Sequence, residues 1–185
     1  GGPIAEIAMS HVRNNFETNV FGTLAMIQGF APQMVKRGSG KIITLSSIAG
    51  LVTMPFGAVY SATKQALEAM MEGLTIELHG TGVQACTVNP GMYNTGFNDR
   101  GVETMMRWFN PETTLTPAEL LKSREGVLDD QLDPQGQIDD LVRVVEEDQS
   151  KFRNLYPPEI TPWIKAIEGK SWEANADEPV WVDMP

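Results

Sequence analysis

Two short runs rich in β-branched residues, each preceded by a long amphipathic segment, constrain the fold more than any other feature of this chain. The runs, residues 41–46 and 83–88, are apolar enough for strands that are buried on both faces. The segments before them, residues 10–36 and 60–78, carry apolar side chains three or four positions apart, which predicts helices. This order of elements predicts an α/β fold with a doubly wound parallel sheet and right-handed crossovers.

The carboxyl ends of the two predicted strands are where functional residues are expected. Ligands of open parallel sheets bind beyond the carboxyl ends of the strands. Here those ends are Ser46-Ser47 and Asn89-Pro90-Gly91. We therefore expect the chemistry of the protein to gather around these two short stretches.

The two halves of the chain differ in charge and in predicted structure. Residues 1–95 hold five basic and five acidic residues, whereas residues 96–185 hold nine basic and nineteen acidic ones and so carry the whole net charge of −10. Such an acidic surface disfavours nucleic acid and anionic membranes as partners. We expect residues 1–95 to form the catalytic half of the α/β domain. Residues 96–185 are expected to form a helical substrate region and C-terminal extension of the same domain.

Within residues 96–185, three helix starts and one docked tail are predicted. The starts combine a capping residue with proline, which suits the first turn of a helix, and they lie at Thr116-Pro117, Asp133-Pro134 and Thr161-Pro162. The second helix should carry Ile138, Leu141, Val142 and Val145 on one apolar face. The third should end at Gly169, and the acidic tail 175–185 should be anchored by Trp181.

Composition argues against a membrane, secreted or metal-binding protein. No run of 18 apolar residues is present, and residues 1–10 lack the basic and apolar regions of a signal peptide. The single cysteine, Cys86, excludes an internal disulfide and fits a small buried strand residue. His11 and His79 have no metal-ligand spacing. We expect a cytoplasmic protein without a metal site.

Tyr60 and Lys64 form the first candidate catalytic pair. They stand four positions apart at the start of a predicted helix, so both side chains project from one face. A phenol is a poor acid–base catalyst at neutral pH because its ordinary pKa is about 10. A nearby ammonium favours the phenolate and so lowers the pKa. Taken alone this pair is a weak signal, because the spacing arises by chance in many chains.

Ser47 and Asn19 add context to that pair. Ser47 ends a predicted strand, where a hydroxyl can donate a hydrogen bond to a carbonyl oxygen as it gains negative charge, or can simply cap the following loop. Asn19 lies in the middle of a predicted helix beside Val20 and Phe21. It is either an exposed polar position or a buried amide that opens the helix locally and holds a water beside Lys64.

Four stretches, taken in order and spacing, resemble the classical short-chain dehydrogenase/reductase family. They are Asn19-Val20-Phe21-Gly22, residues 40–50, Tyr60-Ser61-Ala62-Thr63-Lys64 and Asn89-Pro90-Gly91. The resemblance is clearest from about Ser10 to Thr95 and implies a Rossmann-like fold. It also implies an NAD- or NADP-dependent oxidoreductase that moves a hydride between the nicotinamide and a carbonyl or alcohol substrate.

The resemblance implies a role for each matching residue. Tyr60 would be the general acid/base, and Lys64 would lower its pKa and hold the nicotinamide ribose. Ser47 would polarise the substrate carbonyl, and Asn19 would anchor a proton-relay water. The helices 10–36 and 60–78 resemble those that pair subunits in this family, which implies a homo-oligomer.

Further residues would form part of the cofactor site. Pro90, Gly91, Tyr93 and Thr95 would lie against the nicotinamide, with Thr95 reaching its carboxamide. The family usually has a small aliphatic residue where this chain has Tyr93. The family's glycine-rich phosphate-binding turn and its Asn-Asn-Ala-Gly stretch have no counterpart in the sequence. This departure predicts that the nucleotide-binding sheet is incomplete at its N-terminal side.

Two other interpretations remain open. The chain could be a truncated, non-catalytic remnant that serves as a helix-pairing interaction module. It could also use the same scaffold for epimerisation or dehalogenation, although dehalogenases that resemble this family usually have arginine in place of Lys64. The retention of Ser47, Tyr60 and Lys64 favours the oxidoreductase, whereas the missing phosphate-binding turn favours the remnant.

Overall fold

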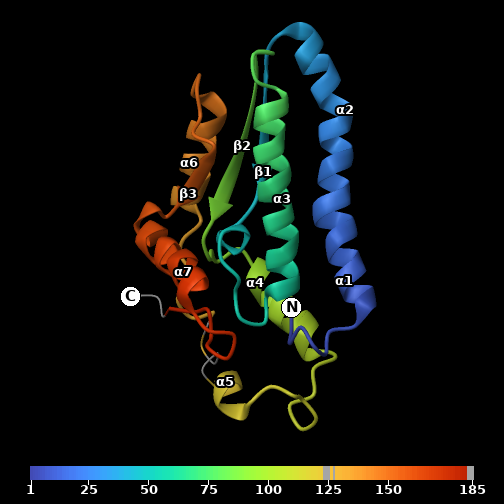
Figure 1. The fold of residues 1–185 in the computed structure, drawn as a ribbon, viewed down its shortest axis with the longest axis vertical. Coiled ribbons are helices and arrows are strands. Elements are labelled where there is room, and N and C mark those ends of the chain that lie inside the picture. The colour runs from blue at the N-terminus through green and yellow to red at the C-terminus, as the bar shows by residue number, and fades with distance from the viewer. Residues whose placement is uncertain (123–125, 127, 183–185) are drawn as a thin grey trace.

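The computed structural model describes residues 1–122, 126 and 128–182 of the chain (Figure 1). Helices and strands alternate along most of this length. In chain order the elements are α1 (Met9–Phe16), a π-helical turn (Glu17–Phe21), α2 (Gly22–Arg37), β1 (Gly40–Leu45), a 3₁₀ turn (Ile48–Gly50), α3 (Ala58–Glu77), β2 (Val83–Pro90), α4 (Phe97–Met106), α5 (Ala118–Lys122), α6 (Gln135–Glu146), β3 (Arg153–Tyr156), a second 3₁₀ turn (Pro158–Ile160) and α7 (Thr161–Glu173).

The sheet of the described residues is parallel, with the strand order β1-β2-β3. β1 and β2 pair from Gly40↔Val83 to Leu45↔Val88, with α3 as the crossover between them. The predicted α/β fold with a doubly wound parallel sheet is confirmed. Figure 1 shows the arrowhead of β2 pointing to the end of the molecule where α3 begins and α4 lies.

β3 is an element that the sequence did not predict. Its residues 153–156 pair with β2 from Thr87↔Arg153 to Pro90↔Tyr156, so the C-terminal half of the chain contributes a strand to the sheet. Four residues with polar Arg153 and Asn154 give little β signal on their own. The strand is held by tertiary pairing, including the buried Asn154 amide, which donates to the Thr87 carbonyl at 3.0 Å.

The two faces of β2 are chemically different. Cys86 and Val88 point to α6, where they pack with the fully buried Val144, as predicted for a buried Cys86. The alternate residues Thr87 and Asn89 are also fully buried but face α3. Because successive side chains of a strand point to opposite faces, the polar residues of β2 lie on the face toward α3, although the sequence of the strand is largely apolar.

β1 is less buried than predicted. Its residues are mostly half-buried, and Leu45 is 55% exposed. β1 is the end strand of the sheet in the described residues, and α6 covers the sheet over β2 and β3. The prediction of a strand buried on both faces is therefore wrong for β1.

The first predicted helix is one continuous helical segment with a local widening. α1, the π-helical turn and α2 follow one another without a break from Met9 to Arg37. The segment ends at Gly38, which adopts a left-handed conformation with φ of 72° and caps α2, as the glycine signal predicted. Figure 1 shows α1 and α2 running alongside α3 on one side of the sheet.

α6 begins where expected but buries a different face. The Asp133 carboxylate accepts a hydrogen bond from the Gln135 amide at 2.7 Å, which starts the helix. Val144 is fully buried against the sheet, whereas Ile138, Val142 and Val145 are 48%, 48% and 57% exposed. The four predicted residues do share one face of the helix, but that face is largely exposed, and of the set only Leu141 packs near the core.

The C-terminal segment is docked as predicted, although α7 is longer. The helix continues through Gly169 and ends at Glu173, because Gly169 does not adopt the left-handed conformation that ends α2 at Gly38. The rings of Trp163 and Trp181 pack edge to face at 5.4 Å, and the Trp163 indole donates to the Val182 carbonyl at 2.8 Å. Across residues 1–122, 126 and 128–182, no helix is both long and apolar enough to cross a membrane.

Candidate active site

The carboxyl ends of β1 and β2 meet, as the sequence predicted. The Ser46 amide donates to the Val88 carbonyl at 2.8 Å and so continues the ladder past the end of β1. Ser47 then caps the 3₁₀ turn, with its Oγ accepting from the Ala49 amide at 3.1 Å. The Asn89 side-chain amide donates to the Ser47 carbonyl at 3.2 Å and ties the two strand ends together.

Tyr60 and Lys64 lie on the first turns of α3, next to these strand ends. The Ser47 side chain lies close enough to the Tyr60 hydroxyl to act on its pKa. The Lys64 ammonium lies 5.6 Å from the centre of the Tyr60 ring and donates to the Leu45 carbonyl at 2.8 Å. The structure therefore brings Ser47, Tyr60 and Lys64 together at one edge of the sheet.

Burial dominates the electrostatics of this group. Burial raises the pKa of Tyr60, and the nearby Ser47 side chain acts against that rise. Burial lowers the pKa of Lys64, and the negative charge of Glu68 acts against that fall. The direction for Tyr60 is opposite to the lowered pKa that the Tyr60–Lys64 spacing suggested. The reason is that the free energy needed to bury a phenolate away from water is larger than the stabilisation it gains from neighbouring groups.

Asn19 lies inside the π-helical turn, so the helix does open locally at this residue. Its side-chain amide donates to the Thr63 hydroxyl at 3.0 Å, and that hydroxyl donates to the Tyr60 carbonyl at 2.7 Å. Thr63 is fully buried and immediately precedes Lys64. Asn19 is thus tied to the turn of α3 that carries both Tyr60 and Lys64, while its role toward a relay water stays a prediction.

The residues predicted to lie against the nicotinamide are Pro90, at the end of β2, and three residues that follow it. Gly91 donates its amide to the Tyr156 carbonyl at 2.9 Å, and a Cβ atom at this position would lie 3.1 Å from the Pro157 ring. Tyr93 is buried, and its hydroxyl donates to the same Tyr156 carbonyl at 2.9 Å. Burial raises the pKa of Tyr93 to about 12. The Tyr93 hydroxyl is therefore engaged within the protein, where it anchors the turn that follows Pro90.

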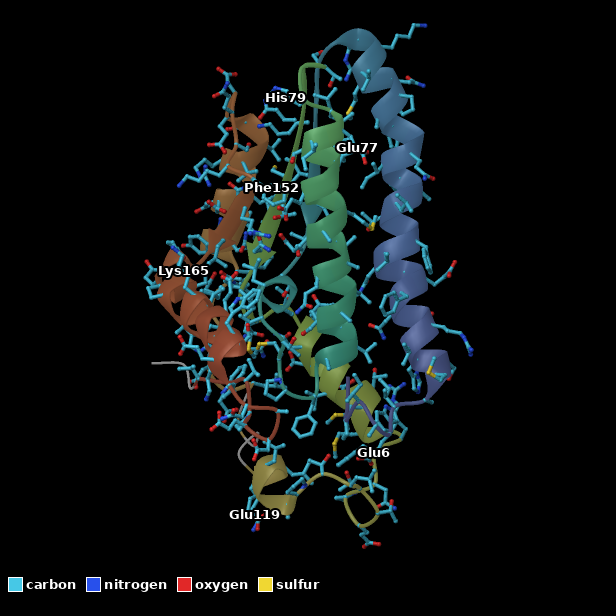
Figure 2. The ribbon with its side chains drawn as sticks, in the orientation of Figure 1. Glu6, Glu77, His79, Glu119, Phe152 and Lys165 are labelled. Atoms are coloured by element: carbon cyan, nitrogen blue, oxygen red, sulfur yellow. The ribbon has the colours of Figure 1, made fainter. Side chains whose placement is uncertain are left out.

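Thr95 differs from Tyr93 in being exposed. Its Oγ accepts a hydrogen bond from the Phe97 amide at 3.4 Å. Figure 2 shows that Glu119 of α5 and His79 just beyond α3 lie at opposite ends of the molecule, with the strand ends between them.

Phe97 and Glu68 also lie at the site, and of these two sequence reasoning missed Glu68. The aromatic ring of Phe97 lies 5.8 Å from that of Tyr60, centre to centre. Glu68, on the turn of α3 after Lys64, bonds to Asn89 of β2 and Arg153 of β3. A signal for Glu68 was present, because an acidic residue sits beside Leu67 on the face that an amphipathic helix should bury.

Comparisons with known proteins agree with this arrangement. The family model described as short chain dehydrogenase matches residues 1–105. Over 106 residues the chain is 39% identical to the uncharacterized oxidoreductase YusZ of Bacillus subtilis, covering 57% of this chain and 38% of that protein. Over 99 residues it is 39% identical to a 3-ketodihydrosphingosine reductase of Bacteroides thetaiotaomicron, covering 54% and 37%. It is 36% identical over 99 residues to human 17-beta-hydroxysteroid dehydrogenase type 1, covering 54% and 30%. These matches span less than two fifths of each relative's length.

Solved structures show the same fold over nearly the whole chain. A short chain dehydrogenase/reductase from Burkholderia phymatum, in complex with NAD, superposes with a TM-score of 0.75 at 24% identity and covers 97% of this chain and 65% of that chain. A short-chain dehydrogenase from Streptomyces avermitilis gives a TM-score of 0.73 at 24% identity, covering 93% and 61%. At 24% identity, these two matches show the fold alone. With the family model matched over residues 1–105 and Ser47, Tyr60 and Lys64 gathered at the strand ends, the chain belongs to the short-chain dehydrogenase/reductase family.

Proposed function

We propose that this chain carries the proton-handling part of an NAD(P)-dependent oxidoreductase site that interconverts an alcohol and a carbonyl compound. One observation carries the proposal: the Ser47 side chain, the Tyr60 hydroxyl and the Lys64 ammonium converge where β1 and β2 end. The relatives named above include a ketone reductase and a hydroxysteroid dehydrogenase, which supports the same reaction class.

The roles follow from the chemistry of each group. Tyr60 is the general acid/base: its neutral hydroxyl, favoured by burial, gives a proton to the substrate oxygen during reduction, and its phenolate takes that proton back during oxidation. Ser47 donates a hydrogen bond to the same oxygen as negative charge develops there. The positive charge of Lys64 stabilises the phenolate. Asn19 holds the turn of α3 that orients Tyr60 and Lys64.

The groups at this edge fit the nicotinamide end of NAD or NADP. The Tyr60 hydroxyl and the Lys64 ammonium are donors for the ribose, and the exposed Thr95 hydroxyl suits a carboxamide. Pro90 and Gly91 provide a side-chain-poor surface for a flat ring. When bound, the nicotinamide supplies hydride transfer to or from the substrate carbon. The residues for the pyrophosphate are not represented in this sequence, since it has no glycine-rich phosphate-binding turn.

The test joins the chain to the strand, glycine-rich turn and helix of a solved relative and compares Tyr60→Phe with Tyr156→Phe. Tyr156 is a matched control because its hydroxyl lies beside Gly136, on the α6 side of β3. We expect Tyr60→Phe to lower kcat by two orders of magnitude or more, on the order of a general acid–base contribution. The affinity for NAD(P)H should fall far less, because the Tyr60 hydroxyl is one of several groups proposed to hold the cofactor. Tyr156→Phe should keep its turnover. Wild-type turnover in Tyr60→Phe would refute the assignment of Tyr60.

A helix-pairing role is the second candidate, supported by the apolar side chains exposed along α2 and α3. Met26 and Phe30, one turn apart on α2, are 60% and 57% exposed, and Ile76 of α3 is 75% exposed. Exposed apolar patches of this kind mark association surfaces, and the proposed oligomer pairs two copies through these helices. Sedimentation of the chain and calorimetric titration with NAD(P)H separate the candidates: self-association without cofactor binding favours the pairing module.

A further inference from the structure

Glu68 is a buried acidic side chain that the proposed roles leave unused. It is 4% exposed and lies on α3 between the buried apolar residues Leu67 and Met71. Burying a carboxylate is costly unless it is paired and fully hydrogen-bonded. An acidic residue at this place therefore needs a reason beyond packing.

Both carboxylate oxygens of Glu68 are partnered. Oε1 accepts from the Asn89 side-chain amide at 2.7 Å. Oε2 accepts from the Thr87 hydroxyl at 3.3 Å and from Arg153 Nε at 3.1 Å. Thr87 and Asn89 lie on β2, and Arg153 lies on β3, so the carboxylate joins α3 to two strands.

These partners connect Glu68 to the site from two directions. Asn89, whose amide bonds to Glu68, also donates to the Ser47 carbonyl at 3.2 Å and so fixes the strand end that presents the Ser47 hydroxyl. Lys64 lies one helical turn before Glu68, on the same side of α3. The 3₁₀ turn after Ser47 packs tightly here, since a Cβ atom on Gly50 would lie 3.2 Å from Glu68 Cγ.

We propose that Glu68 is a positioning residue of the candidate active site, which holds Ser47 through Asn89 and places a carboxylate one helical turn from Lys64. The contribution of Glu68 to catalysis rests on the proposed function, whereas its effect on the positions and charges of Ser47 and Lys64 does not. Glu68 touches no substrate; it acts through Ser47 and Lys64.

The electrostatic part of this role agrees with the local charges. Burial lowers the pKa of Lys64, and the negative charge of Glu68 is the opposing influence. The other charged groups around Glu68 are Arg153, at 3.1 Å and 48% exposed, and Glu72, which lies 3.8 Å from Arg153 and is 64% exposed. Arg153 offsets part of the Glu68 charge, so removal of either partner should move the proton affinity of Lys64, in opposite directions.

The experiment measures Lys64 directly and needs no turnover. The chain is labelled with ¹³C at lysine Cε, the Lys64 resonance is assigned with Lys64→Arg, and its titration is followed by NMR. Glu68→Gln should lower the proton affinity of Lys64 about tenfold, as expected for loss of a neighbouring opposite charge. Arg153→Gln, at an exposed side chain, should raise it by a smaller factor. Glu72→Gln is the matched control on the next turn of α3 and should leave it unchanged.

The outcomes are decisive in each direction. A Lys64 titration that is the same in Glu68→Gln and Glu72→Gln would overturn the proposal. If Glu68→Gln does not fold, as judged by circular dichroism, Arg153→Gln decides: an unchanged or lowered Lys64 proton affinity overturns the proposal. Because Tyr60→Phe kinetics test the proposed function separately, a failure there with the Lys64 shifts intact refutes the oxidoreductase and leaves the positioning role of Glu68.

Discussion

Gly50 is a position where a single methyl group should disturb both the core and the candidate active site. It is buried in the 3₁₀ turn between Ser47 and α3. A Cβ atom here would lie 2.6 Å from Ser46 Oγ, 3.1 Å from the Lys64 carbonyl and 3.2 Å from Glu68 Cγ. The Lys64 carbonyl belongs to the backbone of α3 and cannot rotate away. Gly50→Ala must therefore push the turn, and Ser47 with it, away from α3.

The expected cost follows from two opposing effects. Overpacking a buried site costs about 1–3 kcal/mol, and contacts this short place Gly50→Ala at about 2.5 kcal/mol. Replacing glycine by alanine returns about 0.7 kcal/mol by restricting the unfolded chain. We therefore expect Gly50→Ala to lower the free energy of unfolding by about 2 kcal/mol.

The assay is urea unfolding followed by tryptophan fluorescence, with Gly169→Ala as the matched control. Gly169 lies within α7, and a Cβ atom there meets nothing within 4 Å. Gly169→Ala should raise the free energy of unfolding by about 0.8–1 kcal/mol through helix propensity alone. If Gly50→Ala is as stable as the parent chain, the packing of the turn against α3 is not as the structure describes it.

Three further predictions concern α6, the tail and the turn after β2. Val144→Ala, at a fully buried site, should lower the free energy of unfolding by about 2 kcal/mol. Val145→Ala, at a side chain that is 57% exposed, should change it by less than about 0.5 kcal/mol. Equal effects of the two substitutions would contradict the burial of Val144 against the sheet. Trp181→Ala removes the edge-to-face contact with Trp163, so limited proteolysis should cut residues 175–182 faster, and an unchanged rate would argue against docking. The pKa of Tyr93 is raised from 10.0 to about 12, so burial of its neutral form stabilises the fold below pH 10, and this contribution is lost as the pH rises through 12. Tyr93→Phe should flatten that alkaline loss, and the absorbance of tyrosinate should show one late-titrating group in the parent that the variant lacks.

The strongly periodic elements of the fold were predictable because local pattern and tertiary packing agree in them. The long helix with its stop at Gly38, α3, and the strands β1 and β2 lie close to their predicted ranges. β3 was not predictable, because four residues with little β signal become a strand only by pairing with β2. The buried face of α6 also escaped prediction, since Ile138, Val142 and Val145 are apolar yet face away from the sheet.

The same division applies to the candidate active site. Ser47, Tyr60 and Lys64 were identified from their order and spacing, and the structure places them together. Tyr93 was expected against a cofactor, whereas its hydroxyl is bonded to the Tyr156 carbonyl. The partners of Glu68 lie on strands that are far from it in the chain, so no local pattern could have joined them.

The sequence by itself determined which chemical groups the site holds and the order of the elements that deliver them. A phenol and an ammonium one helical turn apart stay on the same face of α3, and a serine at the carboxyl end of a parallel strand lies at the edge of the sheet where ligands bind. Only the tertiary structure decided how these groups behave. Burial raises the pKa of Tyr60 and lowers that of Lys64. The Glu68 carboxylate can be buried next to the site because Arg153, on β3, forms an ion pair with it. Burial and pairing across the sheet depend on atoms that are distant in the chain. They determine how much free energy it costs to hold a charge on Tyr60, Lys64 or Glu68.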